Sequence, residues 1–289
     1  MKKKVLSIIL AGAMLAAAAG CGSGETASSS SSKDKGASSA SSEDKGSKST
    51  SDAGSASSEG TFTVGFDQGF PPMGFVGEDG EYTGFDLELA AEVANRLNLE
   101  IKYQPIAWDS KDMELESGMI DCIWNGFTMN GREDSYAWSD PYMENDQVFV
   151  VRKDSGISSA ADLEGKIVEV QADSSAEAAL NDNQELASTF GQLLTVADYL
   201  TAMMDLESGA VDAIGMDSVV ASYQIQQTEK DFVILDDSIA AEQYGIGFKK
   251  DNTELRDKVQ KVLNEMAADG TTEEISTKWF GKDITTFSK

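Results

Sequence analysis

The chain has 289 residues, a formal net charge of −27 and no histidine. An acidic surface of this kind repels phosphate backbones, which argues against nucleic-acid binding. Without histidine the chain lacks the commonest general base and the commonest ligand of transition metals, so we expect neither a metal site nor a bound cofactor.

Residues 1–20 have the pattern of a secretory signal. Three lysines precede an apolar stretch over 5–19, which is too short for a membrane span. The segment AAAAGC resembles a bacterial lipoprotein box, with Ala18 where leucine is preferred, and it predicts lipidation at Cys21. A secreted protein in which Cys21 has no role is the alternative.

Residues 21–60 are expected to form a flexible tether that begins at the lipidated cysteine. After Cys21 the stretch is dominated by serine, glycine, alanine and charged residues and contains no aromatic residue. It cannot bury enough apolar surface to offset its ordering entropy. At ~5–6 Å × √n for a Gly/Ser-rich coil, its typical span is about 30–35 Å. The second cysteine, Cys122, is expected to be a small buried apolar residue.

From Thr61 to Lys289 the composition becomes rich in aromatic and branched residues, and predicted strands alternate with helices. Asp86 is expected to be the N-cap of the first helix, where its carboxylate would accept backbone N–H groups. The pattern predicts strands over 62–66, 101–106, 120–124 and 148–152, a hairpin-type turn over 77–80, a helix that opens at 84–86, and a helix over 108–118.

The same alternation continues to the C-terminus. The pattern predicts strands over 167–170, 192–197, 211–214, 232–235 and 244–248, and helices over 161–165, from Ser174 or Ser175, and over 199–208, 218–227, 253–269 and 272–279. Strands that alternate with helices indicate βα units and mostly parallel sheets.

Two segments of the chain nearly repeat each other. Residues 115–123 read LESGMIDCI and residues 206–214 read LESGAVDAI, identical at six of nine positions with an offset of 91. Two copies of one helix-to-strand corner predict an α/β fold of two similar lobes, with a ligand between them. Crossings near 148–152 and 242–248 would form a two-strand hinge.

This organisation divides the chain after residue 60 into two lobes. Lobe 1 is expected to comprise 61–150 plus 246–289, and lobe 2 to comprise 151–245. In open α/β sheets, ligands bind beyond the carboxyl ends of the strands. Four loops follow predicted strands and become the candidate site, namely 67–70, 125–132, Ser174–Ser175 and Asp217.

At these positions the chain resembles a known family. The residues that carry the resemblance, in the family's order over about 62–281, are GFDQGFPPMGF, GEYTGFDLELA, LESGMIDCIWNGFTMNGRED, SDPY, VEVQADSSAEAAL, SGAVDAIGMDS, YGIGFKK and ADGTTEEISTKWFG. Together they are similar to the substrate-binding proteins of polar amino acid ABC importers. The resemblance implies the periplasmic binding protein type II-like fold, with an amino acid held in the cleft between the lobes.

The resemblance also implies partners for the α-carboxylate of that amino acid. Arg132 matches the arginine that clamps it, although the spacing from Thr128 is one residue shorter than usual. A guanidinium gives two parallel charge-assisted bonds to a carboxylate. Thr128, Ser174 and Ser175 would donate to the same group. Asp173 stands where the family often has glycine. A surface ion pair of Arg132 with a neighbouring acid is the alternative for that residue.

The remaining matches imply partners for the α-ammonium group and the side chain. Asp217 matches the family's carboxylate for the ammonium, and capping of the helix that begins at Ser218 is the alternative. Asn125 and Gly126 would contact the ammonium or the side chain. The aromatic residues Phe70 and Trp108 would sandwich the side chain, and Asp67 would touch its distal end, favouring a cation or an amide.

The implied function is that of a monomeric receptor, not an enzyme. It would bind a free polar amino acid and deliver it to the permease of an ABC importer, while a lipid on Cys21 anchors it to the outer face of the cell membrane. A small-acid dehydratase on the same fold and an extracellular amino acid sensor domain are the alternatives. The lack of histidine and of a nucleophile motif argues against the first, and the lack of a following span and signalling module against the second.

Overall fold

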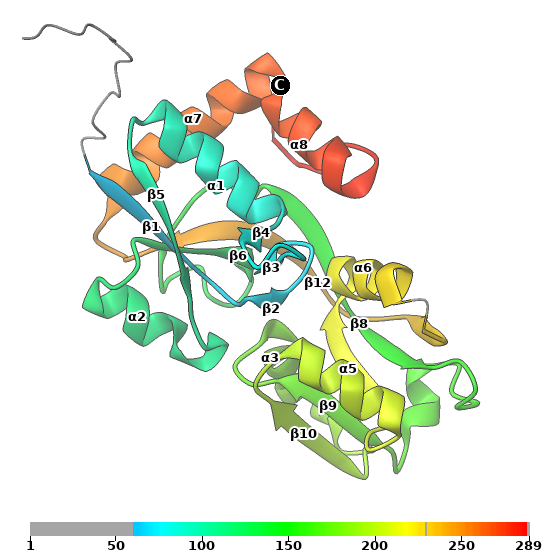
Figure 1. The fold of residues 1–289 in the computed structure, drawn as a ribbon. Helices are drawn as coiled ribbons and strands as arrows, with labels where there is room; N and C mark the ends of the chain where they lie inside the picture. Colours follow the sequence, from blue (N-terminus) through cyan, green and yellow to red (C-terminus); the bar gives the residue numbers. More distant parts are fainter. Residues whose placement is uncertain (1–59, 229, 288–289) are drawn as a thin grey trace, which may run out of the picture. The chain divides into compact units, whose positions relative to one another are not determined.

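The computed structural model describes residues 60–228 and 230–287 (Figure 1). The signal pattern, Cys21 and nearly all of the tether lie outside the described residues. None of the helices in the described part of the chain is long and apolar enough to cross a membrane.

One mixed sheet runs through the described residues, with strand order β10-β9-β11-β8-β12-β6-β1-β5. We call its two parallel halves lobe 1 and lobe 2. Lobe 1 contains β1 (Thr61–Phe66), β5 (Glu100–Pro105) and β6 (Cys122–Thr128), and lobe 2 contains β9 (Ile167–Gln171), β10 (Gln192–Val196) and β11 (Ala213–Asp217).

Two antiparallel strands join these halves. β8 (Met143–Arg152) pairs with β11 and β12, and β12 (Phe232–Phe248) pairs in turn with β6. Figure 1 shows both strands running from one half to the other. The predicted α/β class, two parallel halves joined by two strands, is confirmed.

Short strands and the helices complete the fold. A small sheet of β2 (Gly69–Phe70), β3 (Gly74–Val76) and β4 (Tyr82–Thr83) flanks lobe 1, and β7 (Ala137–Trp138) pairs with β12. The helices are α1 (Phe85–Arg96), η1 (Trp108–Ser110), α2 (Lys111–Ser117), η2 (Ala160–Leu163), α3 (Ser175–Asp182), α4 (Gln184–Ala187), α5 (Tyr199–Ser208), α6 (Ser218–Thr228), α7 (Thr253–Asp269) and α8 (Thr271–Phe280).

The C-terminal helices return to lobe 1. Arg96 at the end of α1 pairs with Asp269 at the end of α7 at 2.7 Å, and Lys278 on α8 pairs with Glu88 on α1, also at 2.7 Å. In Figure 1, α7 and α8 lie beside α1.

The two repeated segments build the same corner twice. Gly118 and Gly209 both end a helix in the left-handed conformation, with φ of 77° and 78°, which glycine adopts without steric penalty. The acid that follows then holds the first strand of its own lobe. Asp121 accepts from Thr63 N at 2.7 Å, and Asp212 accepts from Ile167 N at 2.9 Å. The two-lobe inference from the repeat therefore has a direct structural counterpart.

Several predicted strands differ in length from the observed ones. The predicted strands 232–235 and 244–248 are one strand, β12, because pairing with β8 continues through two irregularities across the polar segment between them. The predicted strand 120–124 runs on to Thr128, and 211–214 runs on to Asp217, since both extensions pair with the joining strands. Polar residues at these strand ends had indicated loops.

Asp86 is not the N-cap of α1, which is Gly84. It lies in the first turn, is fully buried, and accepts hydrogen bonds from Gly126 N at 2.6 Å and Tyr142 Oη at 2.9 Å. Its carboxylate therefore ties α1 to β6 instead of capping its own helix.

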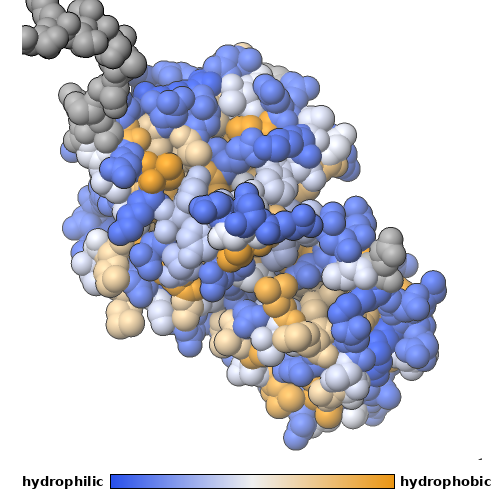
Figure 2. Space-filling model, viewed as in Figure 1, coloured by the Kyte–Doolittle hydropathy of each residue, from blue (hydrophilic) through white to orange (hydrophobic). Residues whose placement is uncertain are grey.

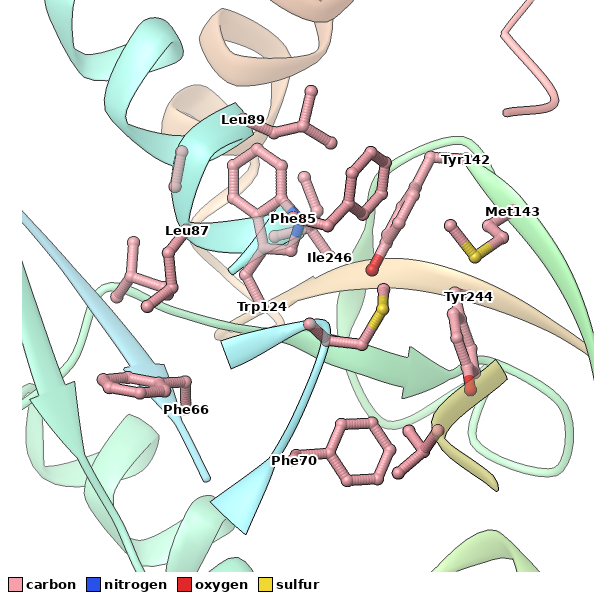
Figure 3. Packing of buried hydrophobic residues seen from close by; sticks show 14 of the residues in the cluster. Phe66, Phe70, Phe85, Leu87, Leu89, Trp124, Tyr142, Met143, Tyr244 and Ile246 are labelled. Carbon is pink, nitrogen blue, oxygen red and sulfur yellow. The ribbon is translucent and has the colours of Figure 1, made fainter. Parts of the chain in front are cut away.

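Buried aromatic residues form much of the core beside β6. Figure 3 shows Phe85 and Trp124 near α1, with Tyr142, Tyr244 and Phe70 farther along the same cluster. Cys122 is fully buried, as expected. The face shown in Figure 2 is mostly hydrophilic, in keeping with the acidic composition.

Candidate functional site

A narrow cavity of about 10 Å³, room for about one water molecule, lies between the two lobes. Nine of the ten residues proposed from the sequence line it, together with Gln171, which the sequence did not suggest. The lining residues are Phe70, Trp108, Asn125, Gly126, Thr128, Arg132, Gln171, Ser174, Ser175 and Asp217. The structure thus brings together four loops and strand ends that are far apart in the chain.

Arg132 provides positive charge to the lining of this cavity, in the part that we call its basic end. Its guanidinium donates to Thr128 O and Asp173 O, both at 3.3 Å, and lies 5.4 Å from the ring centroid of Phe127. Among the described residues it forms no ion pair, so the surface ion pair with a neighbouring acid is not observed. The guanidinium is held by carbonyl groups, which leave its charge uncompensated.

The start of α3 adds to the same end. Ser174 is its N-cap and accepts from Glu177 N at 3.1 Å, while Thr128 Oγ1 donates to Ser175 Oγ at 3.2 Å across the lobes. The N-terminus of an α-helix favours negative charge. This end of the cavity can therefore accept an anion.

Asp217 provides negative charge to the lining of the same cavity, in the part that we call its acidic end. Its Oδ1 accepts from Gln147 Nε2 at 2.7 Å, Asn145 Nδ2 at 3.0 Å and Tyr244 Oη at 2.5 Å. Burial raises the pKa of Asp217 well above its ordinary value, and the neighbouring Glu242 carboxylate raises it further. Both causes disfavour the charged form of Asp217, so a cation placed beside it would stabilise the carboxylate.

Asp217 does not cap α6. The Val219 N–H donates instead to Asn145 Oδ1 at 3.3 Å, so an amide from β8 fills that role. The carboxylate of Asp217 is left to face the cavity and its polar neighbours.

Gly126 lies on β6 with φ of 56°, where a side chain would not fit. An added Cβ would lie 2.9 Å from the Phe70 ring and 3.1 Å from Tyr244. The Gly126 N–H donates to Asp86 on α1. The N–H and the carbonyl of one trans peptide point in opposite directions, so the Asn125 carbonyl, which shares this peptide, points away from α1. Burial is the main reason why the pKa of Asp86 rises to about 7.

Asp67 lies beside the cavity and is not among its lining residues. It accepts from Gln171 Nε2 at 2.6 Å across the lobes and from Gly69 N at 2.7 Å, and burial raises its pKa. It faces a wider outer groove whose lining includes Trp108 and Asp198. Its contact with the cavity therefore passes through Gln171.

A second contact across the lobes lies beside Arg132. The Lys111 ammonium, with a side chain only 2% exposed, pairs with Asp173 Oδ2 and also lies 3.3 Å from Asp173 O. Asp173 has φ of 58°, a left-handed conformation that explains why glycine suits this position. Burial lowers the pKa of Lys111, and the bond to Asp173 opposes that shift.

Sequence reasoning missed the polar residues of the joining strands. Asn145 and Gln147 on β8, and Glu242 and Tyr244 on β12, surround Asp217. Residues 144–147 are all polar in the sequence, so nothing local distinguished the buried Asn145 and Gln147 from their exposed neighbours. Within the described residues, no group of three or more acidic or cysteine side chains could hold a metal ion.

Comparison with known proteins agrees with this geometry. Residues 62–282 match the family of bacterial extracellular solute-binding proteins, family 3. This chain belongs to that family. The resemblance inferred from its motifs is confirmed.

Named relatives and solved structures cover most of the chain. It is 33% identical over 229 residues to the L-cystine-binding protein TcyJ of Escherichia coli K12, covering 78% of this chain and 85% of that protein. It is 31% identical over 288 residues to the L-cystine-binding protein TcyA of Bacillus subtilis, covering 98% and 99%. A substrate-binding protein of an ABC uptake transporter from Streptococcus pneumoniae, solved with bound histidine, has a TM-score of 0.76 and 36% identity, covering 78% and 94%.

Proposed function

We propose that this protein is an extracytoplasmic receptor that binds a polar amino acid between its lobes and delivers it to an ABC importer. The observation that carries the proposal is the pair of opposite charges in the lining of one cavity, from Arg132 and Asp217. An amino acid zwitterion presents the complementary pair of charges.

Each end of the ligand has its own partners in this proposal. Arg132, Thr128 and the start of α3 at Ser174 and Ser175 bind the α-carboxylate. Asp217 binds the α-ammonium group, with Asn125 and Gly126 beside it. Phe70 and Trp108, both less than one tenth exposed, form the walls against the side chain.

The lobes close on the ligand by bending β8 and β12. Lobe 1 consists of 61–150 plus 246–289 and lobe 2 of 151–245 in this proposal. The contacts of Asp67 with Gln171 and of Lys111 with Asp173 cross between the lobes on either side of the cavity residues and support a closed arrangement. Hinge closure between two lobes is a common mode of ligand capture.

In this proposal the N-terminal residues determine where the mature protein is held. Cleavage before Cys21 and lipidation of that residue would anchor the mature protein to the outer face of the cell membrane. The polar stretch up to residue 60 would let the folded part reach the permease as a monomer. The extracellular description of the family supports this placement.

The protein binds its ligand without turnover in this proposal. The relatives and the solved structure described above are named for binding cystine or for holding histidine. The amino acids in these names differ in their side chains, but all of them are polar. Asp67 and Gln171, near the aromatic walls, favour a side chain with a cation or an amide.

A thermal-shift screen tests the proposal. The common L-amino acids and L-cystine are added singly to the purified protein, and at least one is expected to raise Tm by mass action. The matching D-enantiomer is the control, since it cannot place all three groups at once. A folded protein whose Tm responds to no amino acid would contradict the proposed function.

A further inference from the structure

A second buried carboxylate lies beside Asp217. Glu242 on β12 is 5% exposed and Asp217 is 4% exposed. Asn145 Nδ2 lies 3.0 Å from Asp217 Oδ1 and 2.7 Å from Glu242 Oε1, and Gln147 Nε2 lies 2.7 Å and 2.8 Å from the same two atoms. The two acids therefore share their donors.

These donors are too few for two carboxylates. The amide nitrogen of Gln147 carries two hydrogens, but three acceptors lie within 2.9 Å of it, the third being Ser175 Oγ. Buried carboxylates need several hydrogen bonds each to remain ionised. The shortage is relieved when one of the two acids carries a proton and donates.

Arg132 lines the same cavity as Asp217 and Asp67 lies beside it, but neither of these residues bonds Asp217 or Glu242. None of the ion pairs within the described residues includes Asp217 or Glu242. The titratable groups that face the pair are tyrosines. Tyr244 bonds Asp217, Tyr199 reaches it from α5, and Tyr142 lies 6.3 Å from the Tyr244 ring and donates to Asp86. Two like charges this close in a buried site cannot both form unaided.

We propose that Asp217 and Glu242 hold one proton between them and that the α-ammonium group of the amino acid displaces it. The inference rests on the proposed function, and it makes Glu242 a specificity-determining residue for that group. The protonated pair carries one negative charge. After the proton leaves for solvent, two carboxylates and one ammonium again sum to one negative charge, so the buried cluster keeps its net charge.

This exchange couples affinity to pH. Protons compete with the ligand for the two carboxylates, so affinity rises with pH and levels off once the free protein has lost the shared proton. The shared carboxylates also discriminate against amides and alcohols in place of the α-amino group, because an uncharged group cannot replace the proton.

Isothermal titration calorimetry in two buffers of different ionisation enthalpy, phosphate and Tris, measures the released proton directly. Each amino acid that raises Tm in the screen is titrated near pH 7, beginning with L-arginine and L-glutamine, whose side chains do not titrate there. The unmodified protein is expected to release about half to one proton per ligand, and its Kd to fall about tenfold or more from near pH 6 to near pH 8.

Three substitutions identify the source of the proton. Glu242→Gln keeps the shape of the side chain and is expected to release less than about one tenth of a proton, with less than about a twofold change in Kd over the same range. Glu144→Gln removes an exposed acid from the neighbouring strand and is expected to behave like the unmodified protein. Asp86→Asn tests another buried acid near the site and is expected to retain the release.

The outcomes separate the two proposals. Binding with the same enthalpy in both buffers would overturn the shared proton and leave the receptor function standing, and this measurement needs no variant. Release that persists in Glu242→Gln, or that disappears in Asp86→Asn, would also overturn it. Failure of every amino acid to bind would contradict the receptor function itself and this inference with it.

Discussion

The basic and acidic ends of the cavity are built differently. The basic end rests on Arg132, a half-buried residue beyond the end of β6 that is held by two carbonyl groups. The acidic end rests on Asp217, which is almost fully buried and is bonded by side chains of both joining strands. One end can adjust its position, whereas the other is fixed within the sheet.

This difference predicts unequal sensitivity to substitution. A residue fixed in a buried network cannot be replaced by water, and a half-buried side chain can be replaced in part. Substitution of Asp217 is therefore expected to weaken binding more than substitution of Arg132.

Asp217→Asn is expected to weaken amino acid binding most, by about 4–5 kcal/mol, because the ligand ammonium would be buried without a charged partner. Calorimetry with the amino acid selected by the screen gives the value. Asp212→Asn is the matched control, since Asp212 is an acid just before the same strand that bonds Ile167 N and not the cavity. An equal loss in both variants would contradict a special role for Asp217.

Asp86→Asn is expected to change the pH dependence of stability. Its pKa rises from about 3.8 in the unfolded chain to about 7 in the fold, so its contribution is full below about pH 4 and is lost as pH rises through about 7. The difference corresponds to at most about 4 kcal/mol. Urea unfolding between about pH 5 and pH 8 should show a steeper decline in the unmodified protein than in the variant, in which the other buried acids still titrate.

The exposed acid Glu78 provides the control for that series. Glu78→Gln should retain the decline of the unmodified protein. A decline of equal slope in Asp86→Asn would show that the buried carboxylate behind Gly126 does not titrate in this range.

Arg132→Ala is expected to weaken binding by about 3 kcal/mol, less than the change at Asp217, because water and the start of α3 compensate in part. Arg132→Lys keeps the charge and loses the planar fork, so about half of that loss should remain. Calorimetry under the same conditions compares the two. If Arg132→Ala proves more damaging than Asp217→Asn, the contrast between the two ends is reversed.

Gly126→Ala is expected to weaken both stability and binding by about 1–3 kcal/mol, since it adds strain at positive φ and a contact of 2.9 Å with the Phe70 ring. Gly118→Ala shares the left-handed conformation but has nothing within 4 Å of an added Cβ. It should therefore lower stability and leave affinity unchanged. Chemical unfolding and calorimetry on both variants distinguish strain from loss of the site.

Asp173→Asn is expected to have the smallest effect, below about 1 kcal/mol, because the Asp173 side chain is 55% exposed and ion pairs at such positions are weak. Loss of its bond to Lys111 should speed ligand release by a few fold, as measured by stopped-flow fluorescence. Glu254→Gln breaks an exposed pair with Lys258 far from the cavity and should leave the rate unchanged.

The sequence predicted the basic end and the parallel halves better than it predicted the acidic end. Strands that read as apolar runs, such as β1 and β9, and turns marked by Gly118 and Gly209 depend on local pattern, which the sequence carries directly. The rule that ligands bind at the ends of parallel strands then selected Asn125, Ser175 and Asp217.

The partners of Asp217 could not be found in the same way. Asn145, Gln147 and Glu242 are polar residues inside strands, where local pattern indicates a loop or an exposed face. Their burial results from pairing between segments about a hundred residues apart. Asp86 was misassigned for the same reason. An aspartate at the start of a helix is typical of an N-cap, and its actual donor, the Gly126 N–H, lies 40 residues away in the chain.

The two joining strands have a consequence for how variants of this protein should be interpreted. Asn145 and Gln147 belong to β8, and Glu242 and Tyr244 belong to β12. The two strands that bend in the proposed closure therefore also carry the side chains that surround Asp217, the proposed partner of the amino group. A change of register at Ser238 or Ala240, which do not line the cavity, would shift these side chains against each other. If the proposed closure and amino-group site hold, a substitution in either strand is expected to change domain motion and chemical selectivity together.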